Sequence, residues 1–221
     1  MKHDSISVFD FDGTVVSKDS AIEFFKWIFR GSVIRRVLFY SLMPLWILLA
    51  LSKTTRIYGF SIISYIATAC QNRNLFRLRA EFVDYYLYNS GVVVFNGALE
   101  KIKMHQEQGD RIVIISGCLR WLLSGIIKKL NLSKIELIGS EFRLAQKGLM
   151  FREHCYGSNK IKMAKERGLN PERWEYGYSD STADIHWLKH CKLIHVINPT
   201  PGKLKKFKKL INKEIRVLNW V

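Results

Sequence analysis

The chain has 221 residues, a length that suits one large domain or one domain with an insertion and excludes a long modular array. Apolar residues make up 48% of the chain and charged residues 24%, which provides enough apolar surface for a core and argues against disorder. The 35 basic and 19 acidic side chains leave a formal net charge of +16. This charge predicts attraction to a polyanion, either nucleic acid or an anionic membrane.

The cysteines are spaced by dozens of residues and form no CxxC pair, which argues against a zinc ribbon or a dense disulfide scaffold. We expect all of them to be reduced thiols: Cys70, Cys118, Cys155 and Cys191. The N-terminal residues MKHDSISVFDFDGT reach a polar loop by Asp10 and lack the apolar stretch of a secretory signal. The protein is therefore expected to remain in the compartment of its synthesis.

Five short apolar runs, each bounded by Gly, Ser, Asp or Asn, are typical of buried parallel strands: 6–9, 111–115, 135–138, 174–178 and 193–197. Segments with helical spacing of apolar residues lie between them, at 96–102, 119–130 and 160–167. Because strand and helix alternate, we predict an α/β fold with a doubly wound, Rossmann-like parallel sheet.

Two segments interrupt this alternation. Residues 141–153 contain Lys147-Gly148 between short alternating stretches, which predicts a β-hairpin. Residues 20–96 have almost no strand pattern and open with a predicted capping box from Ser20 to Glu23. We expect a core formed by 1–19 and 97–221, with a helical cap at 20–96 inserted after the first strand.

Reactive side chains follow three of the predicted strands. Asp10 and Asp12 follow the first, Ser116 follows the second, and Asp180 with Asp184 follows the fourth. Ligands of α/β sheets bind outside the carboxyl ends of the strands, so these side chains are expected to converge. One carboxylate of the first pair is suited to attack and the other to move protons.

Four motifs occur in order along the chain: FDFDGT at 9–14, IISG at 114–117, GSNK at 157–160 and YSDSTAD at 178–184. They resemble the four ordered motifs of the haloacid dehalogenase superfamily of phosphatases. The resemblance implies that Asp10 is a nucleophile. It also implies an acid/base role for Asp12, and phosphoryl binding by Ser116, Gly117 and Lys160.

The same resemblance implies a Mg²⁺ site formed by Asp10, Asp12 and Asp180, with Asp184 in support. A divalent cation suits the chemistry, because a carboxylate that approaches a phosphate dianion meets strong repulsion. An acid two residues after the nucleophile is characteristic of the phosphatases and phosphomutases of the superfamily. Hydrolysis of a phosphomonoester is therefore expected.

The cap segment contains two uncharged stretches of 16 residues, 37–52 and 57–72. As helices each would reach about 24 Å, short of the roughly 30 Å hydrocarbon core of a bilayer. We expect a helical hairpin that enters one leaflet, with Tyr40 and Trp46 at its interface. The headgroup region would contain the flanking basic residues, Arg30, Arg35, Arg36, Lys53 and Arg56. The alternative is a buried cap core or a dimer interface.

Residues 203–216 hold seven basic side chains, and their apolar residues fall near one helical face. We predict a basic amphipathic helix that binds a membrane surface. The alternative is a terminal helix packed on the sheet.

The position of the insertion resembles the helical-cap subgroup that includes phosphoserine phosphatases. Their motif commonly has a glutamate nine residues after the nucleophile, which engages the amine of the substrate, and here that position is Asp19. The TVVSKDS stretch at 14–20, the YSDS sequence and the Arg-flanked apolar insertion are more similar to bacterial phosphatidylglycerophosphatase C.

These features predict a Mg²⁺-dependent phosphomonoesterase at the cytoplasmic face of the inner membrane, with phosphatidylglycerophosphate as the leading candidate among lipid phosphates. We expect no nucleic-acid partner. One alternative is a soluble cytoplasmic phosphatase of phosphoserine or another small metabolite. A second is a non-catalytic polyanion-binding module.

Overall fold

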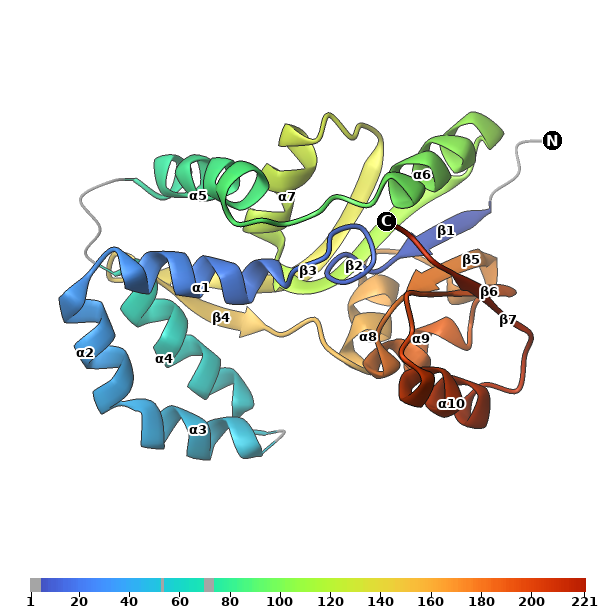
Figure 1. Ribbon diagram of the computed structural model, residues 1–221. Helices are drawn as coiled ribbons and strands as arrows, with labels where there is room; N and C mark the ends of the chain where they lie inside the picture. The colour runs from blue at the N-terminus through green and yellow to red at the C-terminus, as the bar shows by residue number, and fades with distance from the viewer. Residues whose placement is uncertain (1–4, 53, 70–73) are drawn as a thin grey trace.

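A central sheet runs through the computed structural model, which describes residues 5–52, 54–69 and 74–221 (Figure 1). Its seven described strands have the order β4-β3-β2-β1-β5-β6-β7, and every neighbouring pair is parallel except β3 and β4. The strands are β1 (Ile6–Phe9), β2 (Arg111–Leu119), β3 (Ile135–Ala145), β4 (Gly148–Glu153), β5 (Trp174–Ser179), β6 (Leu193–Ile197) and β7 (Ile215–Leu218).

Helices cover both faces of this sheet. On one face lie α6 (Asn96–Gln108) and α7 (Arg120–Lys129), and on the other α8 (Asn159–Glu166), α9 (Ile185–Leu188) and α10 (Pro201–Leu210). Strand β2 shows the cause: Ile112 and Ile114 enter one apolar cluster, while Val113 and Ile115 enter the other. Successive side chains of a strand point to opposite faces, so a continuous apolar run needs a cover on both. The predicted doubly wound α/β fold is confirmed.

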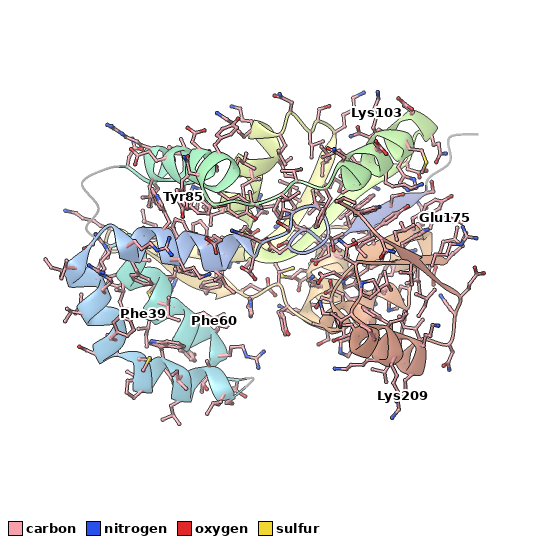
Figure 2. The ribbon with its side chains drawn as sticks, viewed as in Figure 1. Phe39, Phe60, Tyr85, Lys103, Glu175 and Lys209 are labelled. Carbon is pink, nitrogen blue, oxygen red and sulfur yellow. The ribbon has the colours of Figure 1, made fainter. Side chains whose placement is uncertain are left out.

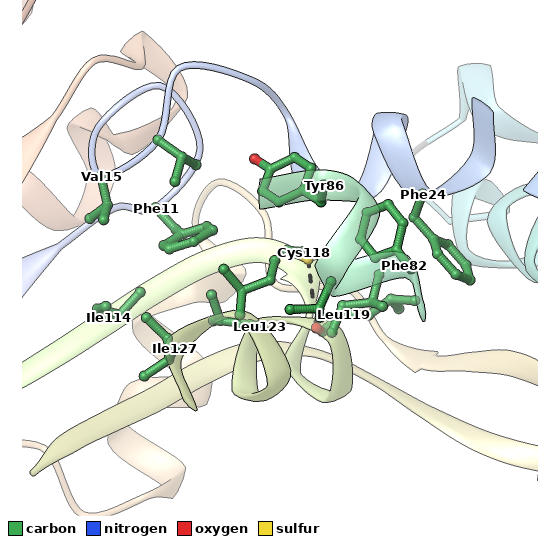
Figure 3. Close-up of a cluster of buried hydrophobic side chains, with 14 of the residues drawn as sticks. Phe11, Val15, Phe24, Phe82, Tyr86, Ile114, Cys118, Leu119, Leu123 and Ile127 are labelled. Atoms are coloured by element: carbon green, nitrogen blue, oxygen red, sulfur yellow. Dashed lines mark hydrogen bonds between the residues drawn. The ribbon is translucent and has the colours of Figure 1, made fainter. Parts of the chain in front are cut away.

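The buried cysteines belong to these cores. Cys118, Cys155 and Cys191 are free thiols, as predicted, while Cys70 lies outside the described residues. Figure 3 shows Cys118 among Phe11 and Leu119, and its Sγ donates a hydrogen bond to the Leu119 carbonyl. Burial raises the pKa of Cys118 well above its ordinary value, so this thiol is a packing group and not a thiolate nucleophile.

The β3–β4 hairpin is present where the sequence predicts a hairpin, but β3 is longer than expected. The predicted strand ends at residue 138, whereas β3 continues through Gly139 to Ala145. A Cβ on Gly139 would lie 2.8 Å from the carbonyl oxygen of Cys118. The glycine therefore marks a close approach to β2, not a strand end.

Five helices lie between β1 and α6 in the described chain: α1 (Ser20–Arg30), α2 (Val33–Ser41), α3 (Met43–Leu51), α4 (Arg56–Thr68) and α5 (Leu75–Asn89). Figure 1 shows α2, α3 and α4 projecting from the body, whereas α5 lies beside α7. Helix α4 packs on β4, where the Leu149 N–H donates to the Thr68 hydroxyl at 2.8 Å. Arg79 of α5 donates to the Trp121 carbonyl at the start of α7.

The prediction of one helix over 37–52 is wrong, because this segment is divided between the end of α2 and the whole of α3. Helices α2 and α3 meet at Leu42 with a bend of 54°. Pro44 lies in the first turn of α3, where a missing N–H is tolerated, but its ring excludes continuation of the preceding helix. Within 5–52, 54–69 and 74–221 no single helix is long and apolar enough to cross a membrane. The bent α2–α3 pair, taken together, has the length and the apolar composition of a membrane-crossing segment.

The helix over 57–72 also differs: α4 ends at Thr68, and 70–72 lie outside the described residues. Residues 203–216 are likewise not one helix, since α10 ends at Leu210 and β7 follows. Phe207 is fully buried and Ile211 nearly so, both in the second apolar cluster. The apolar face of this segment is therefore packed on the sheet, which is the alternative to a free membrane-binding face.

Candidate active site

The predicted site residues meet at the carboxyl ends of β1, β2 and β5, which are neighbours in the sheet. The Asp10 N–H donates to the Tyr178 carbonyl at 2.9 Å, which fixes the end of β1 against β5. Gly13 has a φ of +83°, and a Cβ there would lie 2.5 Å from the carboxyl carbon of Asp180. Glycine at this position lets the loop after β1 approach Asp180 closely.

Asp10, Lys160 and Asp184 form one buried charged group. The Lys160 Nζ lies 2.9 Å from Asp10 Oδ1 and 2.7 Å from Asp184 Oδ1. Asp184 Oδ2 also accepts a hydrogen bond of 2.8 Å from the Ser179 hydroxyl. Asp184 thus holds the ammonium of Lys160 against Asp10, as buried charges require a paired and hydrogen-bonded environment.

The ionisation of this group follows from its burial. Burial raises the pKa of Asp10 well above its ordinary value, and the Lys160 ammonium acts in the opposite direction. Burial alone would lower the pKa of Lys160, but the carboxylates of Asp10 and Asp184 more than offset it and raise the pKa. Lys160 therefore remains an ammonium at neutral pH.

Asp12 faces the start of α1. Its Oδ1 accepts a hydrogen bond of 2.8 Å from the Ser20 N–H, and its Oδ2 accepts one of 3.2 Å from the Ser116 hydroxyl. The Ser116 oxygen itself accepts from the Cys118 N–H at 2.9 Å. Burial, and then the negative charge of Asp19, raise the pKa of Asp12 to about 7. A carboxyl group with this pKa is suited to give and take a proton near neutral pH.

Asp180 is paired with a lysine that the sequence analysis assigned to a membrane-binding face. The Lys203 Nζ, from the first turn of α10, lies 2.8 Å from Asp180 Oδ2. The Asp180 N–H donates to the Thr14 hydroxyl at 3.0 Å, which joins the first loop to the fourth motif. Lys203 opens a run of basic residues, and no feature of the sequence distinguishes it from the solvent-exposed lysines that follow.

In the part of the chain that the structure describes, no group of three His, Cys, Asp or Glu side chains is arranged to hold a metal ion. Lysine ammonium groups pair with Asp10 and Asp180, and the carboxylate of Asp12 is bonded elsewhere. The donor chemistry nevertheless fits Mg²⁺, which prefers hard carboxylate oxygens. Asp180 lies near enough to contribute to the raised pKa of Asp10, a repulsion that a divalent cation would relieve. The ligation of Mg²⁺ by Asp10, Asp12 and Asp180 stays a prediction.

Asp19 caps α1, one residue before the predicted cap at Ser20. Its carboxylate accepts a hydrogen bond of 2.8 Å from the Ile22 N–H. The Ser20 N–H is directed to Asp12, so Ser20 begins the helix instead of capping it. Asp19 also lines the cavity described next, and its role with a substrate amine stays a prediction.

A cavity of about 910 Å³ extends from the carboxylates into the helices of the cap segment. Asp10, Asp12, Gly117 and Lys160 lie at one end. Aromatic and aliphatic side chains of α1, α2, α4 and β4 form much of the remaining wall, beside a few basic and polar groups: Phe25, Phe29, Phe39, Phe60, Ile63 and Phe151. Figure 2 labels Phe39 on α2 and Phe60 on α4. One continuous space thus joins a charged site to an apolar chamber.

His154 was missed by the sequence analysis, although it lines this cavity. Its ring lies 4.9 Å from the Phe60 ring and stacks on Tyr156 at 5.5 Å between centroids. Burial, and then the charge of Arg56, lower the pKa of His154 to about 4. The imidazole is therefore neutral at physiological pH and acts as a polar wall group.

Comparison with known proteins gives the family. Residues 7–189 match the haloacid dehalogenase-like hydrolases. The chain belongs to this family. The matched range includes Asp10 after β1, Ser116 within β2 and Asp180 after β5.

Individual relatives are distant. An "inhibition of morphological differentiation protein" of Streptomyces azureus is 24% identical over 200 residues, which cover 86% of this chain and 70% of the relative. A protein of unknown function from Bordetella pertussis Tohama I has a TM-score of 0.73 at 16% identity, with 96% and 98% of the two chains covered. A phosphoserine phosphatase with a phospho-aspartyl intermediate analogue has a TM-score of 0.58 at 17% identity, with 98% and 94% covered. These likenesses show a shared fold.

Proposed function

We propose that this hydrolase cleaves phosphomonoesters through an aspartyl-phosphate formed on Asp10. Asp10 Oδ1 is held by Lys160, and Oδ2 is the attacking oxygen. As the Asp10–phosphorus bond forms, the bond from phosphorus to the leaving oxygen breaks, and Asp12 gives its proton to that oxygen. Asp10 and Asp180 would hold Mg²⁺, whose positive charge would offset the repulsion between carboxylate and phosphate.

The second half of the reaction uses the same groups. Asp12, now ionised, takes a proton from water, and the resulting hydroxide attacks phosphorus. The Asp10–phosphorus bond breaks and inorganic phosphate leaves. The Lys160 ammonium, the Ser116 hydroxyl and the Gly117 N–H are the groups that bind the phosphoryl oxygens. The position of Lys160 between Asp10 and Asp184 supports this role.

The substrate we propose is a membrane lipid phosphate, with phosphatidylglycerophosphate as the leading candidate, at the cytoplasmic face of the inner membrane. The observation that carries this proposal is the cavity, which begins at Asp10 and continues between apolar walls. A substrate with a phosphomonoester at one end and an apolar body fits a cavity that is charged at Asp10 and largely apolar beyond it. Basic side chains of Lys26, Arg30 and Arg36 also line the cavity and suit a second, phosphodiester charge.

A soluble substrate is the second candidate, and Asp19 supports it. Its carboxylate lines the cavity nine residues after Asp10, where it could pair with the amine of phosphoserine. The polyanion-binding alternative is weaker, because such a module has no use for a buried Lys160 between two carboxylates.

The test is phosphate release from a panel of substrates, with Mg²⁺ or with EDTA: phosphatidylglycerophosphate in mixed micelles, phosphoserine and p-nitrophenyl phosphate. We expect the lipid to have the highest kcat/KM, and EDTA to abolish turnover. The Asp10→Asn variant should lose at least about 10³-fold in kcat. Asp84→Asn, which changes an exposed aspartate on α5, is the matched control and should retain the parent rate. Faster phosphoserine hydrolysis would favour the soluble alternative, and an Asp10→Asn enzyme as fast as the parent would exclude the covalent route.

A further inference from the structure

Helices α2 and α3 contain no buried residue, although both lie wholly within the described chain and are rich in apolar side chains. Six aliphatic side chains of these helices are between 48% and 75% exposed: Val33, Ile34, Val37, Leu45, Leu48 and Leu51. We call these six residues the α2–α3 face. Exposed apolar groups that gather on neighbouring helices mark contact with a protein or a membrane.

We propose that the α2–α3 face inserts into one leaflet of an anionic membrane, from which a lipid substrate enters the cavity directly. This inference rests on the proposed lipid phosphatase function. Each helix has nine residues and a length of about 14 Å, too short to cross a bilayer. With a bend of 54° at Leu42, the pair lies along the leaflet as a monotopic anchor.

The charge of the molecule favours a membrane over a second copy of the chain. The net charge is +16, and basic residues flank the apolar stretch, with Arg35 and Arg36 before it and Arg56 after it. Residues 37–52 between them are uncharged. Two positive chains that met through this face would repel each other, whereas an anionic leaflet attracts basic groups at its surface.

The α2–α3 face is also continuous with the wall of the cavity. Helix α2 carries Val33 and Val37 on the exposed face, and Phe39 and Tyr40 in the cavity lining. The Phe39 ring lies 4.7 Å from Phe29 of α1, so the lining on α2 joins that on α1. Helix α2 lies beside α1 and α4 (Figure 1). This one helix layer would therefore separate the leaflet from the substrate chamber.

The test is flotation of the full chain with vesicles of phosphatidylglycerol and phosphatidylcholine at physiological salt. Leu48→Glu places a charge on the α2–α3 face and should weaken partitioning by about tenfold or more, because the variant loses a leucine that would enter the leaflet and must bring a carboxylate there instead. Leu210→Glu is the matched control. Leu210 is 41% exposed on α10, whose apolar face is packed on the sheet, and the variant changes the net charge by the same amount. It should reduce partitioning less than about threefold.

Hydrolysis of p-nitrophenyl phosphate separates failure of this inference from failure of the proposed function. Both variants should cleave this soluble ester at the parent rate, since neither residue lines the cavity. If the parent chain binds vesicles but cleaves no phosphomonoester, the function is wrong and the membrane surface stands. The inference is overturned if the parent does not float with anionic vesicles, or if both variants lose binding equally. It is also overturned if light scattering shows a dimer that Leu48→Glu dissociates.

Discussion

Asp12 titrates near neutrality because burial and the nearby carboxylate of Asp19 raise its pKa to about 7. The proposed first step requires protonated Asp12, so kcat/KM should fall as the pH rises through this pKa. Asp19→Asn removes the charge that raises the pKa of Asp12. The alkaline limb of the pH–rate profile should then move to lower pH.

Asparagine caps a helix about as well as aspartate, so this variant should leave the stability of α1 nearly unchanged. Glu23→Gln removes a carboxylate one turn further along α1 and is the matched control, with no expected shift of the limb. An alkaline limb that stays in place in Asp19→Asn would show that another group governs it.

Lys203 forms an ion pair with Asp180, one of the carboxylates that we propose as Mg²⁺ ligands. Its Nζ lies 2.8 Å from Asp180 Oδ2, so a cation that binds Asp180 must compete with the ammonium. Lys203→Met should tighten Mg²⁺ binding by about two- to fivefold, a range suited to a partly exposed ion pair. Isothermal titration without substrate measures this directly. Lys205 is an exposed lysine on the same helix, so Lys205→Met should leave the Mg²⁺ affinity unchanged. Weaker binding in Lys203→Met would mean that the lysine supports the site.

Among the individual residues of the candidate site, the sequence predicts those that lie in the four motifs. Asp10 and Asp180 follow β1 and β5, and the Lys160 ammonium contacts Asp10. Ser116 was expected after its strand but lies within β2, which continues to Leu119. Lys203 and His154 do not follow from the sequence. Their partners lie elsewhere in the chain, and their local sequences look like ordinary surface or loop segments.

The crossing of α3 and α4 depends on Gly59. A Cβ there would lie 2.8 Å from the Trp46 carbonyl oxygen and 3.3 Å from the Ala50 nitrogen, both backbone atoms that cannot move independently. Gly59→Ala should therefore destabilise the protein by about 1–3 kcal/mol, despite the better helix propensity of alanine.

The midpoint of urea unfolding measures this change. Gly202→Ala in α10 is the matched control, because a Cβ at Gly202 has no neighbour within 4 Å. It should leave stability unchanged or raise it by up to about 1 kcal/mol. Equal midpoints for Gly59→Ala and the parent would mean that α3 and α4 separate at little cost.

Errors in the predicted elements share one cause. Composition alone favoured a single helix over 37–52, but Pro44 in the first turn of α3 prevents α2 from continuing into it. The basic composition of 203–216 favoured one amphipathic helix and gave no sign of β7, whose residues pair with β6 through the backbone. Hydrophobic spacing identifies the buried strands well, because burial on both faces imposes it. Element ends depend on tertiary contacts, such as Gly139 against β2, that spacing does not record.

For the whole molecule, the order of strands explains why distant motifs form one site. Strands β2, β1 and β5 are adjacent and parallel, so the loops after them meet at one edge. The helices after β1 then extend this edge into an apolar cavity. Charge composition predicted a polyanionic partner, but the cavity is the feature that favours a lipid phosphate over nucleic acid.

The covalent intermediate on Asp10 is the central claim, and acid quenching during turnover of a radiolabelled lipid phosphate tests it most directly. We predict that label appears on the protein within one turnover, maps to the peptide that contains Asp10, and disappears during a chase with unlabelled substrate. Asp10→Asn should carry no label, and Asp84→Asn should match the parent. Release of labelled phosphate with no label on the protein at any time, or label on another residue, would contradict the account.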